Sequence, residues 1–259
     1  MSAIAGPSSL ALSTDRVWWM PPNGALHGFA IDRLMWWNLV ALSALFLLAH
    51  VALLLAMVRR RKTGARREAS WRLELIPLAL LTLLYAWMAI SAQRLWAVAR
   101  YQGAAPNALQ VEVTGMQFQW YFRYPGADAV FGATRPELIN APAGNPLGLD
   151  RTDPHSADDI VSSSLVLPAG REVDIGIRSI DVIHGFFIPG MRLKQNAVPG
   201  MEMHIHFTPS VVGDYPILCS QVCGLGHARM QAHLRIVSVS EYAAWLASHA
   251  PRRAEGAGR

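Results

Sequence analysis

Charged residues are scarce in this sequence, at 16% of 259 residues, whereas a soluble domain usually carries about a quarter. Together with 52% hydrophobic residues, this scarcity excludes a disordered chain and argues against an ordinary cytosolic enzyme. Only two cysteines are present and no Cys-x-x-Cys-His motif occurs, which excludes covalently attached c-type haem. Residues 1–30 lack the basic start and long apolar run of a cleavable signal peptide, so we expect an extracytoplasmic lead-in segment.

Basic residues are concentrated in the first hundred positions. Residues 1–100 contain eleven Lys and Arg but only four Asp and Glu, whereas residues 101–259 contain twelve and fourteen. A basic excess on the apolar part of a chain is typical of a membrane surface, and it excludes nucleic acid as the partner.

Two uncharged runs lie in the same part of the chain, Leu34–Val58 with 25 residues and Leu75–Ala92 with 18. The first reaches about 37 Å as a helix, enough to cross a hydrocarbon core of about 30 Å. We therefore predict a transmembrane hairpin over residues 31–100, with spans at 34–58 and 75–96, rather than two buried core helices. The loop 59–72 carries six positive charges within residues 59–67. The positive-inside rule places this loop in the cytoplasm and both termini outside.

The sequence changes character from about residue 101. Short alternating runs are separated by Gly, Pro, Asn and Asp, a pattern that predicts an all-β sandwich or barrel over residues 101–240. The expected strands are 109–113, 117–124, 160–167, 172–178, 203–207 and 232–239. Residues 126–159 are expected to form a long surface loop, and residues 241–259 a short helix with a tail.

Both cysteines lie in the pattern C-x-x-x-C-x-x-x-H-x-x-M, formed by Cys219, Cys223, His227 and Met230. The ordinary interpretation of two extracytoplasmic cysteines is a disulfide. However, thiolate, imidazole and thioether in one loop are the ligand set that selects copper, whereas zinc sites seldom use Met. A second thiolate suggests two copper ions that share sulfur ligands. His184, in an apolar stretch upstream, is the candidate for a further imidazole.

The hairpin, an aromatic strand, the S-x-D-V-x-H element, a K-x-x-x-x-P-G turn and the copper loop together resemble subunit II of the cytochrome c oxidases, the haem–copper terminal oxidases. The resemblance implies a cupredoxin-like Greek-key barrel that holds a dinuclear copper centre called CuA. The ligands that it implies are the side chains of His184, Cys219, Cys223, His227 and Met230 and the backbone carbonyl of Gln221.

The same resemblance implies the role and the partners of the chain. It would accept electrons from a cytochrome c or another small periplasmic donor and pass them to the haem of subunit I. Reduction of dioxygen and proton translocation belong to subunit I in this family, and subunit III is a further expected partner. The expected location is the bacterial inner membrane, with lipid around the hairpin and the CuA domain in the periplasm.

The sequence departs from the family pattern in its aromatic strand. Phe118 stands where the family commonly has the tryptophan at which electrons enter. Phe118, Trp120, Tyr121 and Asp181 are therefore candidates for electron entry or for support of the ligands. The alternative for Trp120 and Tyr121 is a place in the barrel core.

Two further departures concern ions and protons. Gln221 and Asn196 replace the family's usual Glu and Asp, and an amide oxygen is a weak ligand for magnesium, so we expect little or no magnesium at the contact with subunit I. Glu74, three residues before Pro77, is the candidate for the mouth of a proton channel. An ordinary interface carboxylate near Arg72 is the alternative.

Other functions share part of this pattern. A CuA-containing nitric oxide reductase subunit would carry the same copper motif. A membrane-anchored copper chaperone or storage module would also bind copper, but it would not need a helix hairpin to dock an integral membrane partner. A quinol oxidase subunit II shares the hairpin and barrel but lacks the copper ligands.

Overall fold

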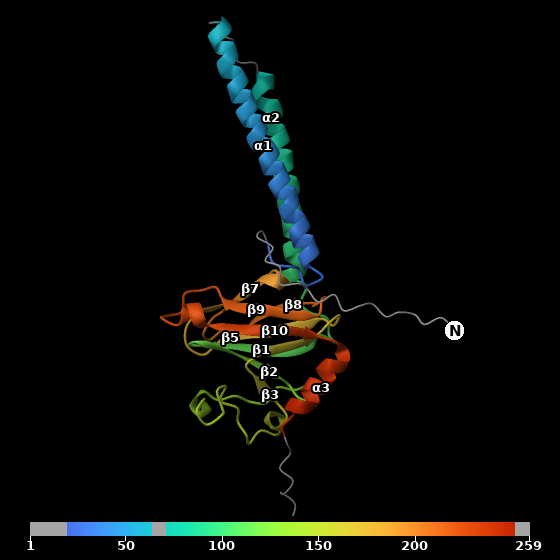
Figure 1. Ribbon diagram of the computed structural model, residues 1–259, viewed down its shortest axis with the longest axis vertical. Coiled ribbons are helices and arrows are strands. Elements are labelled where there is room, and N and C mark those ends of the chain that lie inside the picture. Colours follow the sequence, from blue (N-terminus) through green and yellow to red (C-terminus); the bar gives the residue numbers. More distant parts are fainter. Residues whose placement is uncertain (1–19, 64–70, 252–259) are drawn as a thin grey trace, which may run out of the picture. The chain divides into compact units, whose positions relative to one another are not determined.

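The computed structural model describes residues 20–63 and 71–251. They form two compact units, one of residues 29–102 and the other of residues 20–28 with 103–251 (Figure 1). Most of the expected lead-in (1–19), part of the basic loop (64–70) and most of the tail (252–259) lie outside the described residues.

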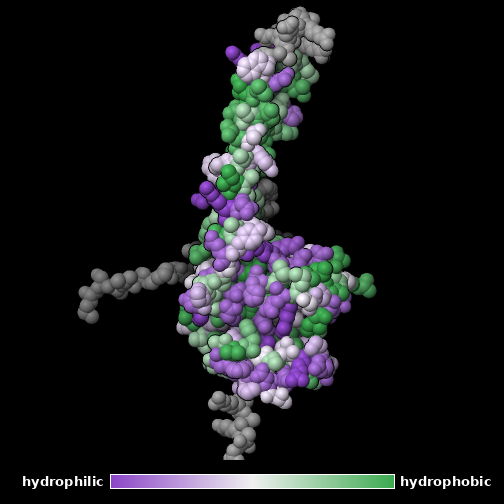
Figure 2. Space-filling model, turned by 180° about the vertical axis from the view of Figure 1, so that it is seen from behind, coloured by the Kyte–Doolittle hydropathy of each residue, from purple (hydrophilic) through white to green (hydrophobic). Residues whose placement is uncertain are grey.

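The first unit is a pair of long helices, α1 (Gly28–Thr63) and α2 (Trp71–Arg100). Their leucine- and alanine-rich sequences favour helix, and both helices extend beyond the predicted spans. The segments Gly28–Arg59 and Glu74–Arg100 are long and apolar enough to cross a membrane. Hydrophobic side chains cover much of the visible helical surface in Figure 2, as expected where lipid or other helices would contact it. The expected two-helix hairpin is confirmed.

The second unit is a β sandwich of two five-stranded sheets, in the orders β3-β2-β1-β5-β8 and β4-β10-β9-β6-β7. The pairs β1–β5 and β4–β10 are parallel, and the other pairs are antiparallel. The strands are β1 (Leu109–Met116), β2 (Gln119–Tyr124), β3 (Ile160–Ser162), β4 (Leu165–Pro168), β5 (Val173–Ser179), β6 (His184–Ile188), β7 (Leu193–Ala197), β8 (Met203–Phe207), β9 (Gly213–Cys219) and β10 (Gln231–Val237).

One hydrophobic core joins the two sheets. Trp120 and Ile175 from the first sheet and Phe186 and Ile217 from the second are all inaccessible to solvent. Burial of such large apolar side chains supplies most of the stability of a sandwich of this kind. The expected all-β domain is confirmed.

A short stretch before α1 belongs to the sandwich as well. The backbone N–H of Gly24 donates to Gly190, the N–H of Leu26 donates to Thr208, and Ala25 is fully buried in the core. The lead-in predicted from sequence therefore contributes to the β domain at residues 24–26.

The C-terminal helix α3 (Val239–His249) begins with a capping box. The Ser238 hydroxyl accepts from the N–H of Glu241, and the Glu241 carboxylate accepts from the N–H of Ser238. Trp245 packs edge-on against Tyr124 of β2, with 4.9 Å between ring centroids, which fixes the helix to the sandwich.

The single strand expected over residues 160–167 is two strands in different sheets, β3 and β4. Ser163 and Ser164 separate them, and the Ser162 hydroxyl accepts from the N–H of Ser164 and donates to its carbonyl. Serine side chains compete for backbone groups in this way, which ends one strand and redirects the chain.

The stretch 126–159 is a long connection, as expected. It contains the short 3₁₀ helices η1 (Pro136–Leu138) and η2 (Pro154–Ala157); η3 (Pro189–Met191) and η4 (His227–Arg229) lie further along the chain.

Candidate metal centre

The candidate ligands come from two neighbouring strands of the second sheet. His184 begins β6, and Cys219 ends β9, which pairs with β6. The backbone N–H of Cys219 donates to the carbonyl of Met230 at 3.1 Å, just before β10 begins. The other predicted ligands therefore lie on one loop that is closed at its base, residues 219–230, called the ligand loop below.

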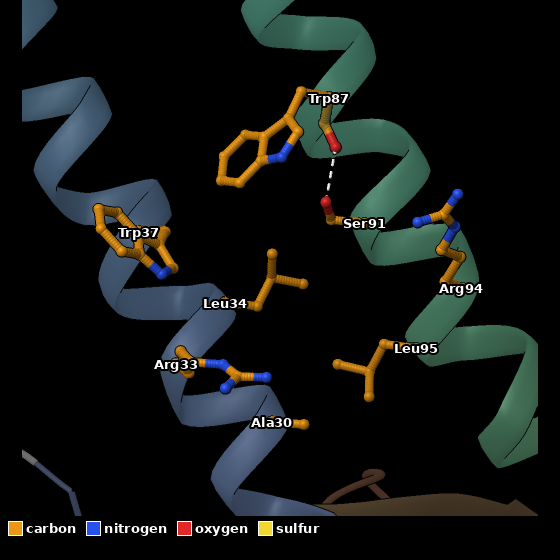
Figure 3. A pocket seen from close by; sticks show the side chains of 8 residues that line it. All are labelled: Ala30, Arg33, Leu34, Trp37, Trp87, Ser91, Arg94 and Leu95. Atoms are coloured by element: carbon orange, nitrogen blue, oxygen red, sulfur yellow. Dashed lines mark hydrogen bonds between the residues drawn. The ribbon is translucent and has the colours of Figure 1, made fainter.

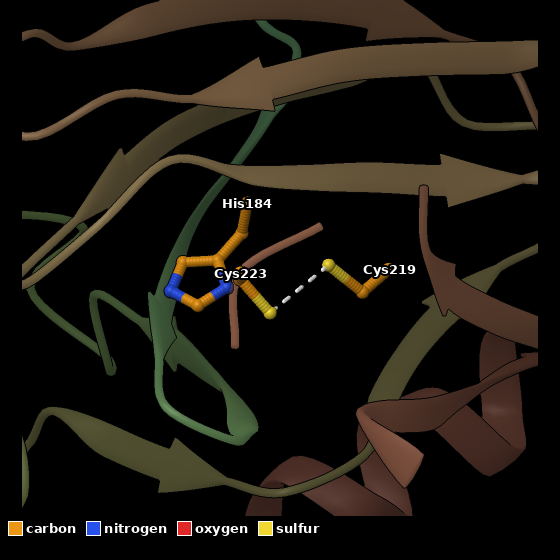
Figure 4. Close-up of side chains that lie close together, drawn as sticks. All are labelled: His184, Cys219 and Cys223. Atoms are coloured by element: carbon orange, nitrogen blue, oxygen red, sulfur yellow. Dashed lines mark hydrogen bonds between the residues drawn. The ribbon is translucent and has the colours of Figure 1, made fainter. Parts of the chain in front are cut away.

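The donor atoms converge on one point. The ring of His184 and the thiols of Cys219 and Cys223 place their ligand atoms within 4.8 Å of one another (Figure 4). The Cys223 sulfur lies 3.8 Å from each of three atoms: the Cys219 sulfur, Nδ1 of His227 and the Met230 sulfur. A disulfide bond would need about 2.0 Å between sulfurs, and both cysteines are free.

Gln221 contributes its backbone rather than its side chain. Its carbonyl oxygen lies 3.2 Å from the Cys219 sulfur, while the residue itself is exposed. Val222 and Leu225 are also exposed, at 79% and 107% of their full areas. The ligand loop thus turns its donors inward and presents apolar side chains outward.

The imidazole of His184 is held in one orientation. Its Nε2 bonds the carboxylate of Asp181 at 2.8 Å, and its Nδ1 is buried with no hydrogen-bond partner among the described residues. Burial disfavours the Asp181 carboxylate, but hydrogen bonds from the Gln117 N–H, the His184 ring and the Val182 N–H outweigh it and keep the Asp181 pKa below its usual range. A buried nitrogen with no partner, on a ring that lies beside two thiols, has the chemistry of a metal ligand.

The surroundings of the Cys223 thiol favour its protonated form. Burial, followed by the neighbouring Cys219 thiol, raises the pKa of Cys223 to about 11. A metal that binds here would have to displace this proton, because the thiolate is the ligand form.

Two glycines leave room for this arrangement. A Cβ on Gly185 would lie 2.4 Å from the Ser220 hydroxyl and 2.8 Å from the Gln221 backbone nitrogen. A Cβ on Gly115 would lie 2.9 Å from the His184 ring. The ligand loop and the imidazole can therefore reach the site only because these positions lack side chains.

The segment Gln117–Phe118 supports the ligand loop from the other sheet. The Gln117 side-chain amide donates to the carbonyl of Cys223 at 2.7 Å. The Phe118 ring lies against the loop, since a Cβ on Gly226 would approach it to 2.4 Å, yet Phe118 is 39% exposed. Phe118 therefore contacts both the loop and solvent.

Trp120 is a core residue that contacts a candidate ligand. It is fully buried, with its ring edge-on to His184 at 5.8 Å and to Phe186 at 5.3 Å between centroids. Tyr121 is half-buried on the same strand, with its hydroxyl 3.5 Å from the Gln119 side chain.

The remaining sequence candidates lie elsewhere. Glu74 is exposed in the first turn of α2, in the helical unit. Asn196 lies on β7 opposite Gly185. Three histidines that were not candidates also lie away from the cluster: His204 pairs with Asp174 on β5, His206 pairs with Glu172 just before β5, and His233 is exposed on β10.

Sequence reasoning predicted the candidate ligands but missed the residues that position them. Gly185 and Gly115 have no signal in a single sequence, because a glycine that makes room for another chain segment looks like any other. Gln117 lies beside the candidate Phe118, but its hydrogen bond to Cys223 spans 106 positions and leaves no local pattern in the sequence.

Thiol, imidazole and thioether donors on a β sandwich fit a soft or borderline metal ion, and copper best. The described fold and site thus define a class: a cupredoxin-like domain with a Cys/His metal cluster, joined to a two-helix membrane hairpin.

Comparisons with known proteins agree with this class. Residues 109–237 match the family model "Cytochrome C oxidase subunit II, periplasmic domain". The "Alternative cytochrome c oxidase subunit 2" of Bradyrhizobium diazoefficiens is 40% identical over 142 residues, 54% of this chain and 50% of that protein. The "Cytochrome c oxidase subunit 2" of Cereibacter sphaeroides is 29% identical over 231 residues, 80% of this chain and 72% of that protein.

One solved structure is similar to part of this chain. The periplasmic domain of subunit II of cytochrome oxidase (CoxB) of Bradyrhizobium japonicum is 27% identical and covers 56% of this chain and 95% of that one, with a TM-score of 0.41. Through its β domain, this chain belongs to the cytochrome c oxidase subunit II family.

Proposed function

We propose that this chain is the electron-entry subunit of a cytochrome c oxidase. It accepts electrons from a cytochrome c or a similar small donor at a dinuclear CuA centre and passes them to the haem of subunit I, where dioxygen is reduced and protons are translocated. The observation that supports this most is the convergence of His184, Cys219, Cys223, His227 and Met230 on one point, with the Gln221 carbonyl beside them.

The protein's part in this function is to hold donors still. Asp181 fixes the His184 ring, and Gln117 fixes the Cys223 carbonyl. The hydrogen bond from the Cys219 N–H to the Met230 carbonyl closes the ligand loop. When bound, the two copper ions supply a one-electron redox centre. Donors that are already in place need little rearrangement between oxidation states, which favours rapid electron transfer.

Electrons enter through Phe118 in this proposal. Phe118 is the aromatic side chain that contacts both solvent and the ligand loop, whereas Trp120 is fully buried and cannot touch a donor. Trp120 instead packs against His184 from inside the core.

The names of the relatives favour dioxygen over nitric oxide as the final acceptor, since those compared are cytochrome c oxidase subunits. A copper chaperone or store is disfavoured, because His184 and Met230 are completely buried and a chaperone needs exchangeable ligands.

We further propose that the β domain and both termini lie on the periplasmic side of a bacterial inner membrane, with residues 59–72 in the cytoplasm. Subunits I and III pack against the hairpin in this arrangement, and Glu74 lies near the cytoplasmic surface, at the mouth of a proton channel.

Magnesium at the contact with subunit I is weak or missing in this proposal, because Gln221 offers an amide where a carboxylate would bind. Metal analysis of the intact complex tests this. Stoichiometric magnesium that is lost in a Gln221→Ala variant would contradict it.

The central proposal is tested on the full chain in detergent, reconstituted with copper. We expect two coppers per chain and an electron paramagnetic resonance spectrum split equally by two copper nuclei. His227→Ala should abolish that spectrum, and His233→Ala, which changes an exposed histidine on β10, should retain it. A single-nucleus spectrum, or no bound copper, would overturn the assignment.

A further inference from the structure

A pocket of about 380 Å³ lies between the two helices of the hairpin (Figure 3). Its lining comes from one segment of each helix: Ala30, Arg33, Leu34 and Trp37 from α1, and Trp87, Ser91, Arg94 and Leu95 from α2. It lies wholly within the helical unit and is separate from the metal centre.

The charged residues in the pocket lining are both arginines. Arg33 and Arg94 line the same pocket from opposite helices; in Figure 3 the Arg33 guanidinium extends into the space between the helices, and that of Arg94 lies along α2 on the side away from Arg33. No carboxylate is among its lining residues, all of which the structure describes; Asp32 precedes Arg33 in the chain but is not in the lining. The Ser91 hydroxyl already donates to the Trp87 carbonyl. Two guanidinium groups without an acidic lining partner favour an anion.

The position of the two arginines along the helices indicates which anion. Arg33 immediately precedes the uncharged run 34–58, and Arg94 follows the uncharged run 75–92. Both therefore lie at the same edge of the apolar zone, where lipid headgroups meet the hydrocarbon. Trp37 and Trp87 lie about one to two turns further in, at the depth where indoles line membrane interfaces.

We propose that this pocket binds the phosphate of an anionic phospholipid such as phosphatidylglycerol. Arg33 and Arg94 hold the phosphate, and the acyl chains lie against Leu34, Leu95 and the indole faces. A net negative headgroup is preferred over phosphatidylcholine because the latter brings its own cation into a site that already holds two.

The test uses the full chain extracted from vesicles of equal phosphatidylglycerol and phosphatidylcholine, with retained lipid counted by native mass spectrometry. We expect phosphatidylglycerol to be retained preferentially. Arg33→Gln and Arg94→Gln should each lower that retention about fivefold. Arg100→Gln is the matched control, because Arg100 lies on the same helix but outside the lining, over the Trp96 ring. Helix content measured by circular dichroism confirms that each variant is folded.

Three outcomes would overturn the proposal. Equal retention of the two lipids, or an equal loss in Arg100→Gln, would show that no specific site exists. Displacement of phosphatidylglycerol by millimolar inorganic phosphate would assign the pocket to free phosphate. Loss of the lipid when the chain is assembled with its haem-bearing partner would show that a protein helix fills the pocket. None of these results depends on copper, so the proposed function is tested separately.

Discussion

At the scale of single residues, the metal centre depends on contacts between segments that are far apart in sequence. Asp181 reaches both the backbone of Gln117 and the ring of His184, so one carboxylate ties the aromatic strand to a candidate ligand. A hydrogen-bond partner that orients a ligating histidine is worth about 10- to 100-fold in metal affinity in known sites.

Asp181→Asn should therefore weaken copper binding by about 10-fold or more, because an amide cannot accept from the Gln117 N–H, the Val182 N–H and the His184 ring together. Competition titration with a copper chelator measures the change. Asp174→Asn is the matched control, since Asp174 makes a similar pair with His204 away from the site. An equal affinity in Asp181→Asn and Asp174→Asn would contradict this role.

Gly185→Ala should prevent copper binding while the sandwich stays folded. The added methyl would collide with the Ser220 side chain and the Gln221 backbone, and backbone cannot move without displacing the ligand loop. Copper content and far-ultraviolet circular dichroism together check this. Gly176→Ala on β5 is the control, because its nearest neighbour is the flexible end of Glu202. Full copper content in Gly185→Ala would refute the argument.

Arg123 is a buried cation that pairs with Asp159 and Glu112 and donates to the Gly132 carbonyl. Arg123→Met would leave the buried Asp159 without its cation, while Glu112 would keep its pair with Arg178, so the free energy of unfolding should fall by about 3–5 kcal/mol. Thermal unfolding in detergent measures the loss. Arg235→Met removes an exposed pair with Asp214 and should cost under about 1 kcal/mol. Similar losses in both variants would rule out a special role for Arg123.

At the scale of elements, the sequence predicts best where the physical pattern is local. The helices follow from their uncharged runs, and β8 (Met203–Phe207) matches its predicted range because it alternates between exposed and buried positions. β6 was missed because most of its residues are buried on both sides, which removes the alternation. β9 was missed because Pro216 interrupts its pattern. The spacing in the ligand loop predicts four candidate ligands, Cys219, Cys223, His227 and Met230, whereas the contacts that hold these residues could not be predicted from it.

The long connection 126–159 contains an element with a predictable pH response. His155 bonds Asp128 at 2.6 Å; this hydrogen bond raises the pKa of His155 and lowers that of Asp128. The stability that His155 contributes to the folded connection is complete below its ordinary pKa of 6.5 and is lost as pH rises through the raised pKa. The stability that Asp128 contributes is complete above its ordinary pKa of 3.8 and is lost as pH falls through the lowered pKa.

Hydrogen exchange in this connection, corrected for intrinsic rates, should therefore be slowest between pH 3.8 and 6.5. His155→Gln should flatten the profile, since glutamine does not titrate. A profile that is unchanged in His155→Gln would assign the pH response to other groups.

At the scale of the whole molecule, metal binding and folding are linked, because the converging donors exist only in the folded domain. Copper at 100 times its dissociation constant should stabilise the folded state by about 2.7 kcal/mol. The melting temperature of the β domain should rise with copper in the unchanged chain and in His233→Ala. It should not rise in Cys223→Ser. A copper-dependent rise in Cys223→Ser would place the stabilising ion elsewhere.

The hydrogen bond that closes the ligand loop has a consequence for how such a site can change. Since Cys219 and Met230 meet at the base, every proposed ligand except His184 is encoded in one uninterrupted stretch of twelve residues, 219–230. Its two ends join the neighbouring strands β9 and β10, so this loop segment could be replaced by another without rebuilding either sheet. The ligands of this stretch can therefore be changed within one segment, whereas His184 and the contacts from Asp181 and Gln117 stay with the scaffold.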